Sequence, residues 1–286
     1  MQYLAGDWTS PWGETGIAFQ PPDERFDRPV GGAVSASSGG PAQPSRTAVR
    51  RQGGGEATMT LAFGDGGLPE FVDNPENRCP VVLLLDASAS MRGAAMDELN
   101  AGVAAFRRQI LIDETASLRV ELSIIAFGGE VRLVRDFTTI DDLITPQLEA
   151  GGDTPMGGAL DLGLKTLEAR KAVYRRAGVH YYRPWLFLIT DGAPTDGPLW
   201  QEAAMRAQEA DLYGRLSFFT VGVEGADMDI LGEIAAANRP PLKLQGLKFR
   251  ELFQWLSTSV RRVSLSRVDA ERVTLPPVHG WAQVGV

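Results

Sequence analysis

The apolar segment at residues 81–85 ends abruptly in the sequence Asp86-Ala87-Ser88-Ala89-Ser90. A run of aliphatic residues favours a strand that is buried on both faces, which is typical of a parallel sheet. In such sheets, ligands bind just beyond the carboxyl ends of the strands. One carboxylate and two hydroxyls at alternating positions are hard oxygen donors, and these suit a hard divalent cation such as Mg²⁺. The segment therefore predicts a metal site at the end of a buried strand.

Two later segments supply oxygen donors that would complete such a site. The glycine-rich turn at residues 151–153 delivers the hydroxyl of Thr154 directly before Pro155, a residue that is favoured at the first position of a helix. The apolar residues 185–189 predict a second buried strand, which ends at Thr190 and Asp191. The candidate metal ligands are therefore Asp86, Ser88, Ser90, Thr154 and Asp191.

This ordered set resembles the metal-ion-dependent adhesion site (MIDAS) of the von Willebrand factor A (vWA) domain, and it matches all five positions of that motif. The resemblance implies that the hydroxyls bind the metal directly and that the aspartates often act through water. It also implies that a Glu or Asp of another protein fills the remaining coordination position of the metal ion. Four further segments resemble the TerY-like branch, bacterial stand-alone A domains associated with tellurium resistance; these are residues 73–80, 181–185, 190–196 and 221–227.

Predicted strands and helices alternate from residue 80 onward. Strands are expected at residues 81–85, 186–189, 216–223 and 242–244, and helices at 94–112, 154–176, 199–213, 228–237 and 249–263. This alternation predicts an α/β fold in three layers, with a doubly wound, mostly parallel central sheet and helices on both faces. A hairpin at residues 120–134 adds one antiparallel edge strand. The resemblance to the vWA domain implies the same Rossmann-like fold.

The chain divides into an extension, a domain and a tail. Residues 1–57 are expected to be a disordered extension, because the part from 28 to 57 is crowded with Gly, Pro and Ser and lacks periodic apolar residues. Alternatively, Trp8, Trp12 and Phe19 dock as a short linear motif, or translation starts at Met59. We expect the vWA domain at residues 68–266 and a C-terminal tail at 267–286 that packs on it.

Charge and cysteine content limit the compartment and the partners. The formal net charge of −8 argues against binding to nucleic acid or to an anionic membrane. The single cysteine, Cys79, excludes an internal disulfide and is consistent with a reducing cytoplasm. The chain shows no secretory signal pattern and no apolar run of the ~20 residues that span a bilayer. We therefore expect a cytoplasmic protein.

Several polar residues outside the motif are assigned structural roles. Asp153 and Asp196 are expected to be solvated loop residues rather than metal ligands. A nucleophilic cysteine needs a base, and neither His180 nor His279 stands in a recognisable pairing with Cys79. We therefore expect Cys79 to be a structural thiol.

The function expected from these features is a metal-dependent protein-interaction module and not an enzyme. Its cofactor would be Mg²⁺, with Mn²⁺ or Ca²⁺ as alternatives. The TerY-like resemblance implies an adaptor in a bacterial tellurite, chemical-stress or defence system, with a kinase–phosphatase pair as partner. An alternative is a substrate adaptor of an AAA-type ATPase. A metal-dependent phosphohydrolase using Asp86 and Asp191 is disfavoured, because Ser88 and Ser90 stand where a second carboxylate or a lysine is needed, and no G-x-x-x-x-G-K-[ST] loop is present.

Overall fold

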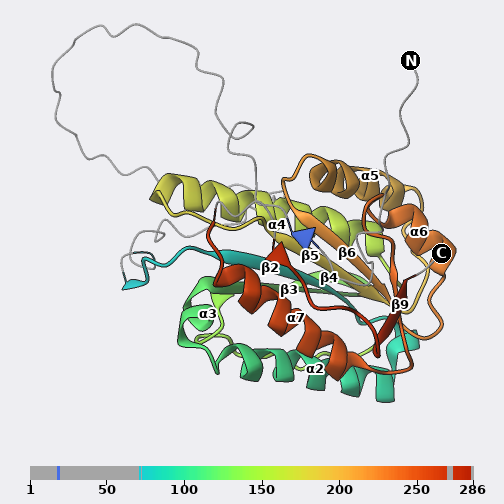
Figure 1. Cartoon of the computed structure of the whole chain (residues 1–286). Helices are drawn as coiled ribbons and strands as arrows, with labels where there is room; N and C mark the ends of the chain where they lie inside the picture. Colours follow the sequence, from blue (N-terminus) through green and yellow to red (C-terminus); the bar gives the residue numbers. More distant parts are fainter. Residues whose placement is uncertain (1–17, 20–70, 72, 269–272, 285–286) are drawn as a thin grey trace, which may run out of the picture.

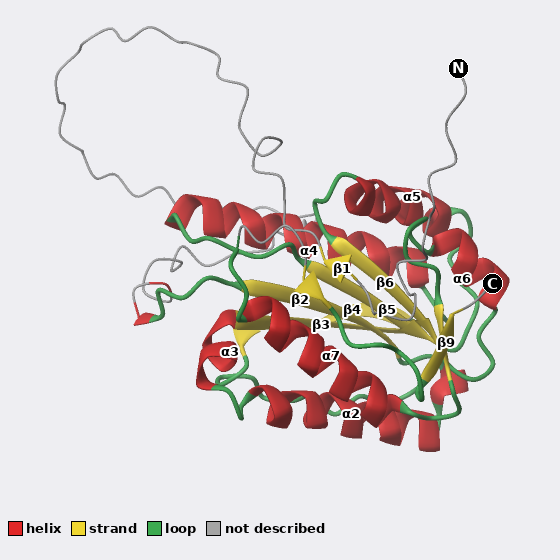
Figure 2. Ribbon diagram, viewed as in Figure 1, coloured by secondary structure: helices red, strands yellow, loops and turns green. Residues whose placement is uncertain are grey.

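The computed structural model describes residues 18–19, 71, 73–268 and 273–284. A seven-stranded sheet forms the middle layer, in the order β4-β3-β2-β5-β6-β7-β9 (Figures 1 and 2). Its parallel strands are β2 (Cys79–Asp86), β3 (Val120–Gly128), β5 (Trp185–Thr190), β6 (Ser217–Gly222) and β7 (Leu242–Leu244). The expected doubly wound, mostly parallel architecture is therefore confirmed.

Both edges of the sheet carry an antiparallel strand. Strand β4 (Glu130–Thr139) pairs with β3 as the hairpin pattern predicted, and Gly129 makes the turn with a φ of 72°. Strand β9 (Ala282–Val284) pairs with β7 at the other edge. The sequence predicted only the first of these, because three residues are too short a segment to show a strand pattern of their own.

Helices of the described part of the chain cover both faces of the sheet (Figure 2). Helices α2 (Ala94–Ile110), α3 (Glu114–Arg119) and α7 (Phe249–Ser264) lie on one face, and α4 (Met156–Ala177), α5 (Leu199–Leu212) and α6 (Met228–Ile234) on the other. Helix α3 was not expected as a separate element. Asp113 caps it by accepting a hydrogen bond from the backbone N–H of Ala116 (3.0 Å), which starts a new helix where α2 has ended.

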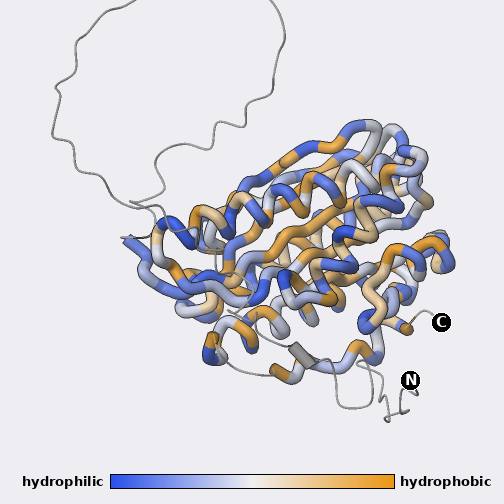
Figure 3. The backbone as a smooth tube through the Cα atoms, turned by 90° about the horizontal axis from the view of Figure 1, so that it is seen from above, coloured by the Kyte–Doolittle hydropathy of each residue, from blue (hydrophilic) through white to orange (hydrophobic). Residues whose placement is uncertain are grey.

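The central strands are buried on both faces, as their composition predicted. Leu83 and Leu85 pack against α2 and α7, whereas Val82 and Leu84 pack against α4 and α5, and all four are fully buried. Figure 3 shows the hydrophobic residues (orange) running along the strands in the middle of the molecule. The strand ends that hold the candidate ligands are therefore anchored in two packed cores.

The described parts of the two terminal segments lie against each other. Strand β1 (Ala18–Phe19) pairs antiparallel with β8 (Val273–Thr274). The C-terminal segment then contacts α7, where Trp255 Nε1 donates a hydrogen bond to the carbonyl of Pro276 (2.7 Å). Apart from β1, the expected disordered extension at residues 1–57 lies outside the described residues. No described helix combines the length and apolar character needed to cross a bilayer.

Candidate metal centre

Asp86 lies at the carboxyl end of β2, beside the end of β5. The strand register pairs Leu85 with Ile189, so Asp86 comes next to Thr190. The Asp86 side chain is fully buried, and its two oxygens have different donors. Oδ1 accepts a hydrogen bond from the backbone N–H of Ser88 (2.8 Å), and Oδ2 accepts one from Thr190 Oγ1. The carboxylate is therefore held in one orientation.

A row of oxygen atoms joins the two strand ends. Ser88 Oγ lies 3.0 Å from Ser90 Oγ, and Ser90 Oγ donates a hydrogen bond to Asp191 Oδ1 (2.8 Å). In an octahedral site with metal–oxygen distances of roughly 2.0–2.1 Å, neighbouring ligand oxygens lie about 2.9 Å apart. The spacing of these three oxygens therefore fits adjacent positions around a divalent cation. Ser88 is buried and Ser90 is exposed, so the row leads from the core to the surface.

The loop that carries Thr154 is tied to the Asp86–Ser90 loop by two backbone hydrogen bonds. Gly151 N donates to the carbonyl of Ala87 (2.8 Å), and Ala89 N donates to the carbonyl of Gly152 (2.9 Å). These bonds fix the turn that immediately precedes Thr154.

Thr154 itself lies beside the turn that follows Asp191. A Cβ atom placed on Gly192 would come within 3.3 Å of Thr154 Oγ1 and 4.0 Å of Asp86 Oδ2. The Thr154 side chain is 6% exposed, and its hydroxyl has no hydrogen-bond partner among the described residues. A bound cation would provide that partner. The structure thus brings all five candidate ligands together.

The environment of Asp86 opposes its negative charge in the absence of a cation. Burial raises the pKa of the Asp86 carboxyl above its usual value, and the negative charge of Asp191 adds to this rise. The hydrogen bonds from Ser88 and Thr190 act in the opposite direction and lower the pKa. A divalent cation would favour the charged carboxylate, because an opposite charge nearby stabilises the ionised form.

The donor set contains two carboxylates and three neutral hydroxyls. Among the described residues, no group of three or more His, Cys, Asp or Glu side chains could hold a metal ion. A cation at this site would therefore depend on the hydroxyl oxygens, which suit Mg²⁺ better than they suit a soft metal. Cys79 is fully buried and His180 is exposed, and neither belongs to this site.

Three residues support the site in ways that the sequence analysis missed. Besides Thr190, these are Thr195 and Asp196. Thr195 Oγ1 accepts a hydrogen bond from Thr154 N, and Thr195 N donates one to the carbonyl of Thr154, both at 3.0 Å. Asp196 was expected to be a solvated loop residue, and this was wrong, because Asp196 Oδ2 accepts a hydrogen bond from Gly158 N (2.8 Å) in the first turn of α4.

Only one of these supporting residues had a sequence signal. Thr190 is a polar residue that ends an apolar strand directly before a candidate ligand.

Asp153 is exposed, as expected. Helix α4 begins at Met156 and not at residue 154, with Pro155 in the N-cap position.

Solved structures of similar fold come from different organisms. The pilus adhesin SpaC from Lactobacillus rhamnosus GG, in its open conformation, aligns with a TM-score of 0.53 at 13% identity, over 65% of this chain and 30% of that one. The vWF domain of the pilus tip protein Mfa5 from Porphyromonas gingivalis aligns with a TM-score of 0.49 at 12% identity, over 67% of this chain and 97% of that one. The mussel byssus protein PTMP1 with a zinc-occupied MIDAS motif aligns with a TM-score of 0.45 at 16% identity, over 65% of this chain and 48% of that one.

These similarities concern the fold alone, and the chain spans less than half the length of the PTMP1 and SpaC chains. No curated protein sequence gives a significant match. The family model of the von Willebrand factor type A domain matches residues 81–249, which hold all five candidate ligands. By this match and by its fold, the chain belongs to the von Willebrand factor type A domain family.

Proposed function

We propose that this vWA domain is a metal-dependent protein-interaction module. Asp86, Ser88, Ser90, Thr154 and Asp191 would hold a divalent cation, which we take to be Mg²⁺, with Mn²⁺ or Ca²⁺ as alternatives. When bound, the cation supplies an electrophilic coordination position that a Glu or Asp of a partner protein can fill. The domain would thereby bind its partner without transforming it.

The observation that supports this proposal most is the row of oxygens formed by Ser88, Ser90 and Asp191, with separations of 3.0 and 2.8 Å. Two of these three groups are neutral hydroxyls. Neutral ligands leave much of the charge of a cation uncompensated, so an anionic group from outside gains more by binding. The exposure of Ser90 gives such a group access to the site.

The biological role that we propose follows from the TerY-like segments. We propose an adaptor in a bacterial tellurite, chemical-stress or defence system, with a kinase–phosphatase pair as its partner. We also propose the cytoplasm as its location, because its single cysteine, Cys79, is a free and fully buried thiol.

The test is a calorimetric titration of Mg²⁺, Mn²⁺ and Ca²⁺ into the full chain. We expect stoichiometric binding by the wild type and its loss in Asp86→Ala and Thr154→Ala. Thr258→Ala removes a hydroxyl that bonds only within α7, where Thr258 Oγ1 donates to the carbonyl of Gln254, and serves as the matched control. Circular dichroism should show that all three variants remain folded.

Two results would contradict the proposal. One is unchanged metal affinity in both ligand variants. The other is absence of metal binding by the wild type, both alone and with excess acetate as a substitute for the partner's carboxylate.

A further inference from the structure

We infer that the carboxylate recognised by this domain lies among Lys and Arg side chains on the partner, because the rim of the candidate metal centre is acidic. This inference rests on the proposed function and adds the chemistry of the surrounding contact. It follows from the charges on the loops that border the site.

Three loops beside the candidate ligands each present an exposed carboxylate. Glu130 follows the β3–β4 turn, Asp153 precedes Thr154, and Glu224 lies between β6 and α6. None of these side chains is a candidate ligand.

Backbone contacts place these three loops at the site. Gly129 N donates a hydrogen bond to the carbonyl of Asp153 (2.8 Å), which joins the first loop to the second. A Cβ atom placed on Gly225 would lie 3.8 Å from the carbonyl oxygen of Asp191, so the third loop borders the other side of the centre. The acidic side chains therefore belong to the same rim.

Positive charge on this rim compensates only part of the negative charge. Glu130 forms an ion pair with Arg132 (3.4 Å), and Arg92 is an exposed guanidinium after the Ser90 loop. Asp153 and Glu224 have no ion-pair partner among the described residues. Asp227, which caps α6, adds another exposed carboxylate beside Glu224. Carboxylates therefore outnumber guanidinium groups among these rim residues.

An acidic rim disfavours a partner that offers only negative charge. In water, the interaction between two unit charges roughly 8 Å apart changes a binding affinity by about twofold. The effects of several such interactions on the affinity multiply. A lysine or arginine beside the ligating carboxylate reverses the sign of each of these interactions. A phosphate, with a charge of about −2 at neutral pH, would be repelled more strongly than a carboxylate. The rim therefore selects a carboxylate in a basic context.

The test uses fluorescent peptides of equal length with one central Glu, flanked by Lys, by Ser or by Asp, and a Lys-flanked peptide with Gln at the centre. Binding is measured by fluorescence anisotropy with the full chain in Mg²⁺ at about 50 mM salt, where the Debye length exceeds ~10 Å. We expect the Lys-flanked Glu peptide to bind at least tenfold more tightly than the Ser-flanked one. Binding should be lost with chelator and with the Gln peptide.

Charge reversal on the rim gives the second measurement. The variant with Asp153→Lys and Glu224→Lys should reduce the preference for Lys flanks at least fivefold. The matched control carries Glu114→Lys and Asp142→Lys, two exposed positions at the start of α3 and just after the end of β4, away from the loops that border the metal centre. This control should keep the wild-type preference.

The possible results separate this inference from the proposed function. Binding that depends on metal and on the central Glu, but differs less than twofold between flanks, overturns the inference and leaves the interaction module intact. The inference is also overturned if both double variants lose the preference for Lys flanks equally. The preference would then not depend on the charges of the rim. Absence of metal-dependent binding to every peptide contradicts both proposals.

Discussion

Thr190 Oγ1 donates a hydrogen bond to Asp86 Oδ2 across the neighbouring strands β5 and β2. The same hydroxyl oxygen accepts a hydrogen bond from Gly192 N (3.1 Å). One buried side chain thus orients the carboxylate at the end of β2 and the turn that follows Asp191. Its position between the two acidic candidate ligands makes it a positioning residue for the metal centre.

Replacing this hydroxyl by a methyl group should weaken metal binding. Thr190→Val leaves Asp86 Oδ2 buried without its donor, and we expect a metal affinity about tenfold lower, as is common for residues that orient metal ligands. The free energy of unfolding should fall by about 1–2 kcal/mol. Calorimetry and urea denaturation measure the two effects. Thr190→Ser keeps the hydroxyl and should resemble the wild type; equal metal affinities in the two variants would refute this role.

Gly192 leaves space that the Thr154 hydroxyl and the Asp86 carboxylate need. Gly192→Ala would place a Cβ atom 3.3 Å from Thr154 Oγ1. We expect a several-fold lower metal affinity with little change in the melting temperature, because the added methyl displaces a ligand and not the core. Gly232→Ala is the control, since a Cβ there meets nothing within 4 Å. Full metal affinity in Gly192→Ala would show that Thr154 adjusts without cost.

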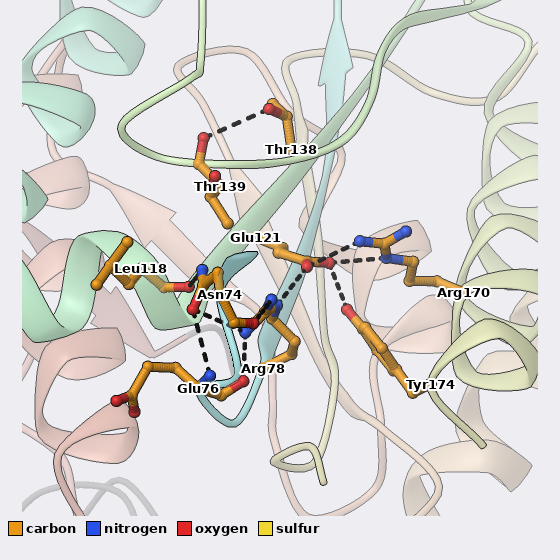
Figure 4. Close-up of polar contacts among 9 residues, drawn as sticks. All are labelled: Asn74, Glu76, Arg78, Leu118, Glu121, Thr138, Thr139, Arg170 and Tyr174. Atoms are coloured by element: carbon orange, nitrogen blue, oxygen red, sulfur yellow. Dashed lines mark hydrogen bonds and ion pairs between the residues drawn. The ribbon is translucent and has the colours of Figure 1, made fainter. Parts of the chain in front are cut away.

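A buried polar cluster lies at the start of β3 (Figure 4), whereas the metal centre lies at the carboxyl ends of β2 and β5. Glu121 is fully buried and accepts hydrogen bonds from Arg78 Nε (2.9 Å), from Arg170 Nε (2.8 Å) and from the Tyr174 hydroxyl. Burial and the negative charge of Glu121 raise the pKa of Tyr174 well above its usual value, so this hydroxyl remains a donor. The cluster joins the segment directly before β2 to β3 and α4.

Removing the negative charge of Glu121 should destabilise the fold without affecting the metal centre. Glu121→Gln leaves Arg78 buried without its counter-ion, and we expect a loss of about 3–5 kcal/mol in the free energy of unfolding. Tyr174→Phe removes one donor and should cost about 1–2 kcal/mol. Urea denaturation measures both losses, and metal affinity should stay unchanged in any folded variant. A Glu121→Gln variant as stable as the wild type would contradict this account.

Asp113 should make the stability depend on pH. The hydrogen bond from Ala116 N holds the pKa of Asp113 below its usual value, against a smaller opposing effect of burial, and Arg261 (3.1 Å) lowers it further. Because the pKa is lower in the folded state, this stabilisation is present above the unfolded pKa of about 4 and is lost as pH falls through the folded value.

The corresponding variants separate the helix cap from the charge. Asp113→Ala should lower the free energy of unfolding by about 1 kcal/mol at pH 7. The difference in stability between this variant and the wild type should become smaller at acidic pH. Asp113→Asn keeps a good cap and removes the charge, so its smaller deficit should vanish at low pH. Thermal melts between pH 7 and pH 2.5 measure both. A deficit in Asp113→Asn that is constant across this range would exclude the charge as its cause.

Much of the fold could be predicted because its signals are local. The apolar run before Asp86 and the one before Asp191 mark buried strands by their composition alone. Short elements escaped prediction: α3 depends on the cap at Asp113, and β9 depends on pairing with β7. Neither contains enough residues to show a period.

The oxygen donors that end the buried strands could be identified from the order of residues alone, because a strand, its end and the polar residues beyond it are adjacent in the chain. The orientation and stabilisation of these donors depend on contacts between residues that are far apart in the chain. Thr190 meets Asp86 across 104 positions, and Tyr174 meets Glu121 across 53. Such contacts depend on strand order, register and the packing of helices on the sheet. Those are properties of the whole folded chain, and a local pattern of residues does not encode them.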